Sequence, residues 1–189
     1  TTAIDYLEKL PEEYKSVVKK KLVQLATNDK KSVVRASAID YLSNNFRDDD
    51  LDSVYHNAVK ERSYSVATSA FYALAKKDKK EVMKIVRQFE TDKSINMRLA
   101  VAQIYSLYGN DENQNFFVKL SEETSGWNNI SFAMFYTNFL KHCTDSIINS
   151  GALILENIAR TKDNKWVCYF GQKGLKDLVQ MYEDREKET

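Results

Sequence analysis

A short alanine-rich helical pattern recurs along this chain of 189 residues, and it constrains the fold more than any other feature. The clearest copy covers residues 62–75, where alanines alternate with bulky apolar residues at helical spacing. Small residues let a neighbouring helix approach closely, and bulky ones fill the remaining gaps. Related patterns begin at Ser32, Ser94 and Ile130, so that the copies lie roughly 31 to 36 residues apart. This period is typical of an array of helix pairs.

Each alanine-rich segment is followed by a second predicted helix with an apolar stripe. The predicted pairs are 32–44 with a helix starting near Asp48, 62–75 with 79–90, 94–108 with a shorter helix around 116–120, and 128–142 with 145–159. Four aspartates occupy the corresponding turns: Asp48, Asp78, Asp111 and Asp145. A carboxylate at such a turn can accept hydrogen bonds from the free N–H groups of the next helix, so we expect all four to act as caps.

The expected fold is all-α, a HEAT-like α-α superhelix (solenoid) of about four to five helix pairs with a C-terminal capping helix. Five glycines and one proline favour helices joined by short polar links. We interpret residues 1–189 as a single helical-repeat domain and as a fragment of a longer protein. Leading helices are expected over 1–29, helix-pair repeats over 30–160, and a capping helix with a tail over 161–189. Gly171 and Gly174 are expected to weaken or bend the capping helix.

Bulk composition narrows the function only slightly. A formal net charge of +1 points to neither nucleic acid nor a membrane surface. No apolar run approaches the roughly 20 residues of a membrane span, and no signal peptide is present; the compartment stays unknown. Cys143 and Cys168 lie in apolar surroundings, which favours buried free thiols and leaves a disulfide as the alternative.

The chain carries no recognisable catalytic or metal-binding motif. His56 and His142 are its only histidines, and neither belongs to an H-E-x-x-H motif or a Cys/His group at zinc spacing. A G-x-S-x-G nucleophile motif and a glycine-rich phosphate loop are also missing. We therefore predict no catalytic residue, no metal ligand and no cofactor within this chain.

Polar residues on the second helices are the candidate contact residues. If these helices line the concave side of a solenoid, five side chains project there: His56, Lys60, Lys84, Arg87 and Lys119. The alternative is that these side chains are simply solvated. The lysine-rich stretches 15–21 and 76–87 are a second candidate feature, because lysines can neutralise phosphates. The acidic residues mixed into the second stretch favour a solvated face over nucleic-acid binding.

Aromatic residues surround one predicted helix on several sides, namely Phe132, Phe135, Tyr136 and Phe139. Two interpretations stay open, deep burial within this chain or contact with a partner domain.

Three segments carry a family resemblance: residues 35–42, 61–76 and 98–105. They resemble HEAT-like repeats and, more narrowly, the C-terminal helical domain of bacterial M1-family zinc aminopeptidases. That domain is similar in its repeat pattern D/R-S-Y-x-V-x-x-x-A-x-x-A-L-A, here 62–75, in a turn such as Gly109-Asn110-Asp111, and in a final helix with a tryptophan, here Trp166. The resemblance covers about residues 30–179.

The resemblance implies an accessory domain that closes a peptide chamber over a catalytic domain and limits substrate size. Its partners would be the parent protein's own catalytic domain and the peptide substrate, and zinc would belong to that catalytic domain. The family's H-E-x-x-H…E and G-x-M-E-N motifs do not occur in these 189 residues, so no catalytic residue is carried over. The alternatives are a free-standing HEAT-like scaffold that binds a protein partner and, less favoured, a HEAT-like nucleic-acid binder.

Overall fold

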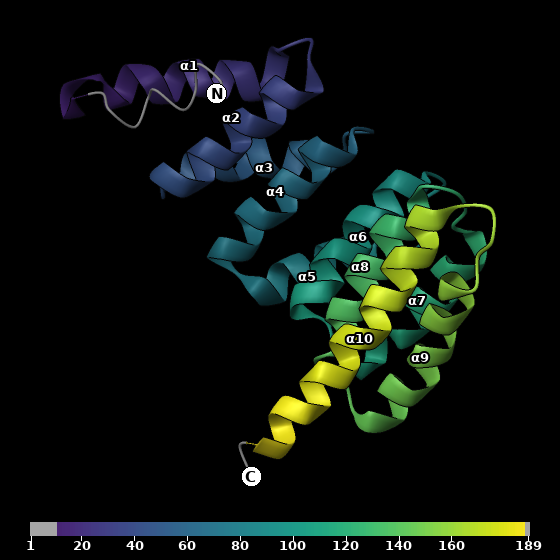
Figure 1. The fold of residues 1–189 in the computed structure, drawn as a ribbon. Helices are drawn as coiled ribbons and strands as arrows, with labels where there is room; N and C mark the ends of the chain where they lie inside the picture. The colour runs from purple at the N-terminus through teal and green to yellow at the C-terminus, as the bar shows by residue number, and fades with distance from the viewer. Residues whose placement is uncertain (1–10, 188–189) are drawn as a thin grey trace. The chain divides into compact units, whose positions relative to one another are not determined.

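The computed structural model describes residues 11–187, and every regular element within that range is a helix. The expected all-α class is thus confirmed, with repeat-like helix pairs (Figure 1). The described part of the predicted leading segment starts at Pro11, so residues 1–10 lie outside it, as do residues 188–189 of the tail. The chain divides into two compact units, 1–88 and 89–189, and each is described by itself. The superhelical course of the whole array stays a prediction.

The first unit contains five α-helices within its described residues. They are α1 (Lys15–Asn28), α2 (Ser32–Asn45), α3 (Asp52–Ala58), α4 (Tyr64–Lys77) and α5 (Lys79–Arg87), with short 3₁₀ turns at Glu12–Tyr14 and Asp49–Leu51. Helix α2 packs between α1 and α4, and α4 also contacts α3 and α5. The four segments predicted to form the first two helix pairs are therefore confirmed as helices, to within a few residues at their ends.

Helix α4 is the centre of the first unit, as its composition predicts. Val66, Ala67, Ala70 and Phe71 have no exposed surface, and Ala73 and Leu74 are also buried. A helix that must contact α2, α3 and α5 at once cannot carry large side chains on every side. Its alanines make that close approach possible, and Phe71 and Leu74 fill the gaps between the neighbours.

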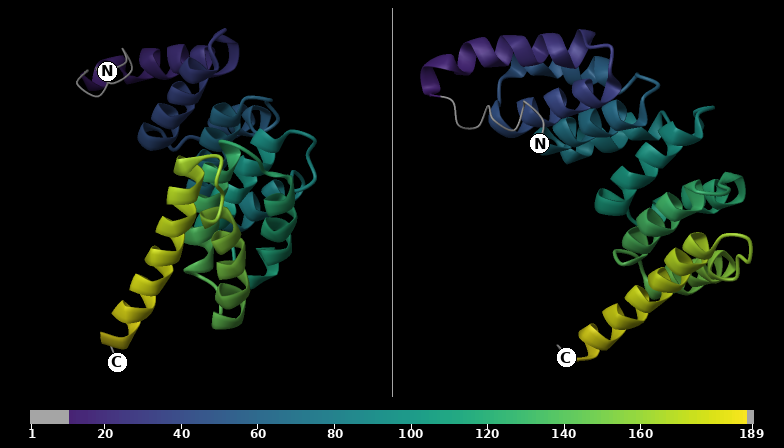
Figure 2. Two further views of the ribbon diagram at one scale, coloured as in Figure 1. Left: turned by 45° about the vertical axis from the view of Figure 1, so that its right-hand side comes forward. Right: turned by 45° about the horizontal axis from the view of Figure 1, so that its top comes forward.

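The second unit contains the remaining helices of the described residues. They are α6 (Ile95–Tyr108), α7 (Gln114–Glu123), α8 (Asn128–Leu140), α9 (Asp145–Ala159) and α10 (Lys165–Lys187), with a 3₁₀ turn at Asp111–Asn113. Helix α8 contacts both α6 and α10. Helix α9 packs against α8 and α10, and α7 contacts α6, α8 and α9. In both views of Figure 2 the yellow helix α10 runs beside the green helices α8 and α9.

Aromatic rings fill the core of the second unit. The ring of Phe117 on α7 stacks on Phe139 and Tyr136 of α8, with centroids 4.4 and 5.1 Å apart. Phe132 packs against Tyr136 at 5.2 Å. Phe132, Tyr136 and Phe139 have no exposed surface, and Phe135 is half-buried. Of the two interpretations left open by the sequence, deep burial within this chain holds for Phe132, Tyr136 and Phe139.

Two glycines of α10 serve close packing, and α10 runs as one helix through both. The expected weakening or bend of this helix stays a prediction. A Cβ added at Gly171 would lie 2.4 Å from the backbone nitrogen of Ala159 on α9. At Gly174 it would lie 2.3 Å from the Thr137 hydroxyl oxygen on α8. The cost of glycine in a helix interior is accepted here because any side chain would push α10 away from its two neighbours.

The prediction that four aspartates cap the second helices holds for Asp78 alone. Its carboxylate accepts hydrogen bonds from the backbone N–H groups of Lys80 and Glu81 at 2.8 and 3.2 Å. At the 3₁₀ turn before α7 the cap is Asn110, which accepts from the N–H of Glu112 at 3.0 Å.

The other three aspartates connect neighbouring helices instead of capping. Asp48 pairs with Lys19 of α1 at 2.7 Å. Asp111 accepts from the hydroxyl and backbone N–H of Thr144 at 2.6 and 3.0 Å. Asp145 accepts from the Tyr182 hydroxyl at 2.8 Å. In these turns each carboxylate binds an ammonium or hydroxyl group from another segment in place of the N–H groups of the helix that follows it. Such donors can form stronger hydrogen bonds with a carboxylate than a single backbone N–H group does.

Candidate binding surface

Four of the five predicted contact residues lie in the first unit. His56 is on α3, where its Nδ1 lies 2.9 Å from the carbonyl oxygen of Asp52. Its Nε2 lies 3.4 Å from the Glu81 carboxylate of α5, so this histidine connects α3 with α5, the second helices of two successive predicted pairs. Lys60 is exposed just after the end of α3, and Lys84 and Arg87 are exposed on α5. The structure thus brings His56 close to α5, the helix that carries Lys84 and Arg87.

The fifth predicted residue, Lys119, lies on α7 in the second unit, where it lines a cavity of about 310 Å³. Phe116 and Leu120 form apolar walls of this cavity, and charged side chains of both signs surround it: Glu90, Arg98, Glu112, Lys119 and Glu123. This mixture of charges selects no single class of ligand.

One arginine of this cavity is less well satisfied than its counterpart in the first unit. Arg98 is the fourth residue of α6, and Arg35 is the fourth residue of α2. Arg35 binds Glu61 through both Nε and Nη2, at 3.1 and 2.5 Å. Arg98 reaches Glu123 through Nη2 at 2.7 Å, while its Nε is buried without a partner among the described residues. The two repeats therefore keep the same arginine but not the same bidentate pair.

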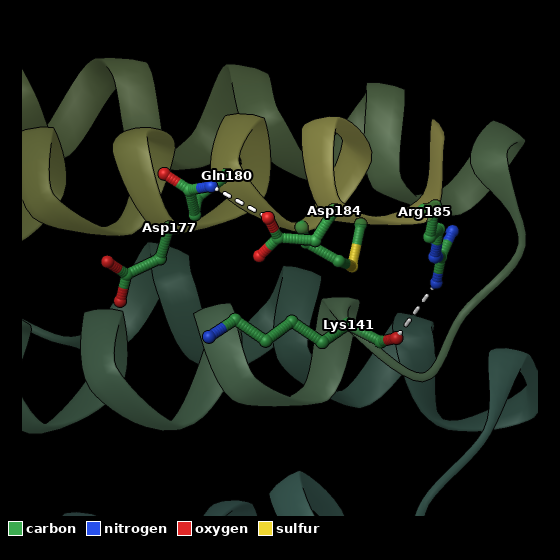
Figure 3. Close-up of a pocket in the computed structure, with 6 residues that line it drawn as sticks. Lys141, Asp177, Gln180, Asp184 and Arg185 are labelled. Atoms are coloured by element: carbon green, nitrogen blue, oxygen red, sulfur yellow. Dashed lines mark hydrogen bonds between the residues drawn. The ribbon is translucent and has the colours of Figure 1, made fainter. Parts of the chain in front are cut away.

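A second site lies between α8 and α10, where two neighbouring cavities share Lys141 and Asp177. We call them together the α8/α10 groove. One cavity, of about 180 Å³, is lined by Ala133, Met134, Thr137, Asn138, Lys141, Phe170, Lys173, Gly174 and Asp177. The other, of about 430 Å³, is lined by Lys141, Asp177, Gln180, Met181, Asp184 and Arg185 (Figure 3). The groove thus has an apolar end and a charged end.

At the charged end, the acidic groups already have partners. Asp177 pairs with Lys173 at 2.7 Å. Asp184 accepts a hydrogen bond from Gln180 at 2.9 Å and pairs with Lys187 at 3.3 Å, which holds the pKa of its carboxyl below its usual value. The groove therefore carries no unpaired carboxylate among these lining residues.

Lys141, unlike these carboxylates, has a charged group without a partner among residues 11–187. Its side chain stretches along the gap between the two helices in Figure 3, and its ammonium makes no hydrogen bond or ion pair with another described residue. Its carbonyl oxygen, by contrast, accepts from Arg185 at 3.3 Å, and that arginine also lies 3.8 Å from Asp145. Among the lining residues, Lys141 thus carries a positive charge that no carboxylate of the described chain pairs with.

Exposed apolar side chains lie at the other end of the groove and near the start of α10. Met134 on α8 is 52% exposed, and Trp166 and Tyr169 near the start of α10 are each 52% exposed. The rings form a chain of edge contacts, Trp166 to Tyr169 at 6.5 Å and Tyr169 to Phe170 at 5.4 Å. Aromatic residues are enriched at protein interfaces because they bury large area at low entropic cost.

The sequence did not predict Met134, Phe170 or Lys141 as contact residues. Met134 and Phe170 follow the apolar pattern of core residues, and Lys141 follows the pattern of a solvated helix end. The available signal was the pair Gly171 and Gly174, because two glycines in one helix indicate a place where another helix comes close.

The two cysteines are free thiols in the structure, as the favoured interpretation predicts, but only Cys143 is buried and Cys168 is half-buried. Burial, together with the nearby Asp111 carboxylate, raises the pKa of the Cys143 thiol to about 12. This thiol also lies 3.4 Å from the carbonyl oxygen of Phe139. A thiol that stays protonated at neutral pH is a poor nucleophile, so Cys143 has a packing role.

Within residues 11–187, no group of three or more His, Cys, Asp or Glu side chains is arranged to hold a metal ion. None of the helices in that range combines the length and apolar character needed to span a bilayer.

The fold and the groove define the class of this protein as an all-helical, repeat-like protein. No protein-family model matches the chain, and no curated protein matches it either.

Proposed function

We propose that this chain is a non-catalytic helical-repeat binding module. The observation that carries this proposal is the α8/α10 groove, with exposed Met134 at its apolar end and the unpaired Lys141 ammonium where its two cavities meet. Trp166 and Tyr169 add exposed aromatic surface near the start of α10. Isolated exposed apolar residues are ordinary, but several around one groove favour an interface.

The finer proposal is that the module belongs to an M1-type zinc aminopeptidase. It would pack against the catalytic domain, close the peptide chamber and restrict the length of peptide that enters. Support comes from the repeat pattern at 62–75, the turn at Gly109-Asn110-Asp111 and the final helix around Trp166. Zinc and the catalytic residues would reside in that other domain, and peptides would be the substrate.

The test of the finer proposal is the coding sequence upstream of Thr1. An H-E-x-x-H motif followed by a downstream glutamate is the expected result. The catalytic domain would then be expressed with and without the 189-residue chain, and hydrolysis of short and long peptides compared. We expect the chain to lower the rate for long peptides more than for short ones. A gene without a peptidase domain would refute the aminopeptidase assignment.

The second candidate is a free-standing HEAT-like scaffold that binds a protein partner. The same groove supports it, and a gene without a peptidase domain would favour it.

Nucleic-acid binding is less well supported, because lysines of the 76–87 stretch are engaged within the first unit. Lys77 pairs with Asp49 and Asp52 at 3.0 and 2.5 Å, and Lys76 bonds the Asn44 side chain at 2.5 Å. A DNA affinity that falls steeply with salt would reverse this judgement.

A further inference from the structure

We infer that the α8/α10 groove is a docking site for an acidic, amphipathic protein segment. This segment inserts an apolar side chain between Met134 and Phe170 and places a carboxylate at Lys141. The inference rests on the proposed binding role but not on the aminopeptidase assignment, so the two can fail separately.

The apolar end has the size and the lining for one anchoring side chain. The cavity of about 180 Å³ is bordered by Met134, Phe170 and Ala133. At about 30 Å³ per water in the liquid, this space corresponds to roughly six waters, which is enough for a leucine- or phenylalanine-sized side chain. Such a side chain would displace water from Met134, which is otherwise half exposed.

Helices α8 and α10 touch at the floor of the groove. Gly174 lets α10 come within contact of Thr137, whose side chain is 5% exposed and whose hydroxyl has no partner among the described residues. Helices held at such a contact present a preformed groove, so that little ordering is needed when a partner binds. The unsatisfied hydroxyl is an additional polar group at the floor, beside the anchor position.

Charge decides the chemistry of the occupant. Around the groove, Lys173 pairs with Asp177, Lys187 with Asp184, and Arg185 lies near Asp145. The ammonium of Lys141 is left over, halfway along the groove and shared by both cavities. A carboxylate is the group that compensates it, whereas a basic segment would add a second unpaired cation.

The required pattern is therefore an apolar anchor with an aspartate or glutamate near it in space. On a helical segment this corresponds to an acidic residue three or four positions from the anchor. Trp166 and Tyr169 extend the apolar border along α10 and would contact further apolar residues of the same segment.

The experiment is a selection of random 12-residue peptides displayed on phage against the immobilised 189-residue chain. Enriched peptides are synthesised with a fluorescent label, and their affinity is measured by fluorescence anisotropy. The variants are Lys141→Glu and Met134→Asp, both at groove positions that are not part of the buried core. Lys176→Glu is the matched control, since this exposed lysine is on α10 but does not line the groove.

We expect the enriched peptides to combine an apolar residue with a nearby acidic one. Lys141→Glu and Met134→Asp should each weaken binding at least about tenfold, while Lys176→Glu changes it less than about twofold. A peptide with lysine in place of its acidic residue should regain affinity for the Lys141→Glu variant. This charge-swap rescue is a readout that a general loss of stability would not produce.

Three results would overturn the inference. The first is a selection that enriches no peptide, and the second is peptide binding that ignores both groove substitutions. The third is binding to vesicles of phosphatidylcholine and phosphatidylglycerol, or to single-stranded DNA, that is lost in the Lys141→Glu variant while no peptide binds. A gene without a peptidase domain would leave the inference standing and would remove only the aminopeptidase assignment.

Discussion

Replacing Gly171 by alanine adds one methyl group at the tightest point between α9 and α10. The new Cβ would lie 2.4 Å from the nitrogen and 2.8 Å from the Cα of Ala159, and 2.9 Å from the carbonyl carbon of Ile158. Ordinary contacts between such atoms lie near 3.5 Å, so α10 would have to retreat by about 1 Å. All three atoms belong to the backbone, which cannot turn aside as a flexible side chain could.

The free energy of unfolding follows from two opposing effects. Overpacking costs about 1 to 3 kcal/mol, and three backbone clashes place Gly171→Ala near the upper end. Alanine in place of glycine in a helix interior recovers about 1 kcal/mol. We therefore expect a net destabilisation of the second unit by about 2 kcal/mol.

Urea unfolding followed by tryptophan fluorescence measures this effect. The only two tryptophans, Trp127 and Trp166, both belong to the second unit, so the signal reports on that unit. With a slope of about 2 kcal/mol per molar urea, the midpoint should fall by about 1 M. The matched control is Gln172→Ala, an exposed neighbour on the same helix that should change stability by less than about 0.5 kcal/mol.

The reasoning is refuted if Gly171→Ala is as stable as the unmodified chain or more stable. That outcome would mean that helix propensity dominates and that α9 and α10 do not touch at Gly171.

Removal of a buried hydroxyl should have opposite effects at two tyrosines. Tyr55→Phe should leave stability unchanged or raise it, because the Tyr55 hydroxyl is buried without a partner among residues 11–187. Tyr136→Phe should cost about 1 kcal/mol because its hydroxyl is bonded to the buried Gln114, and thermal unfolding of both variants measures the two effects. Hydrogen bonds from Thr144 lower the pKa of Asp111, so its stabilising contribution is present above the unfolded-state pKa of about 3.9 and is lost as the pH falls through the lower folded-state pKa. The stability difference between the unmodified chain and Asp111→Asn should thus be constant between about pH 5, roughly one unit above the unfolded-state pKa, and about pH 8. It should shrink in more acidic solution, and a difference independent of pH would contradict the reasoning. Cys143, whose thiol pKa is raised to about 12, should react with a disulfide reagent at about pH 8 only as fast as the chain unfolds, because a buried, protonated thiol is a poor nucleophile. The test uses a Cys168→Ala background, and rapid reaction without denaturant would show that the thiol is accessible.

The identity and order of the helices were predictable because they depend on local pattern. The alanine-rich segment at 62–75 combines small and bulky residues at helical spacing, and it forms α4, with nearly all of one long face buried. The turn at 109–111 separates α6 from α7 because Gly109 and Asn110 end one helix and begin the next. The period between these segments is enough to indicate successive helix pairs.

The capping prediction failed where a distant donor competed with the local one. Asp78 accepts from the N–H groups of its own helix, as its position alone suggests. Asp111 accepts instead from Thr144, which lies 33 positions further along the chain. Position in the turn is a local property, but the identity of the nearest donor is not.

The sequence by itself determined that this protein is helical, where its helices lie along the chain, and that these 189 residues carry no recognisable catalytic motif, since all three follow from residue type and spacing. Only the tertiary structure decided that Gly171 and Gly174 are packing contacts and that Lys141 lacks an acidic partner beside Met134 and Phe170. The physical reason is that a close approach or an unpaired charge depends on which side chains of distant segments meet. Here α8 and α10, more than 20 positions apart in the chain, meet along one groove.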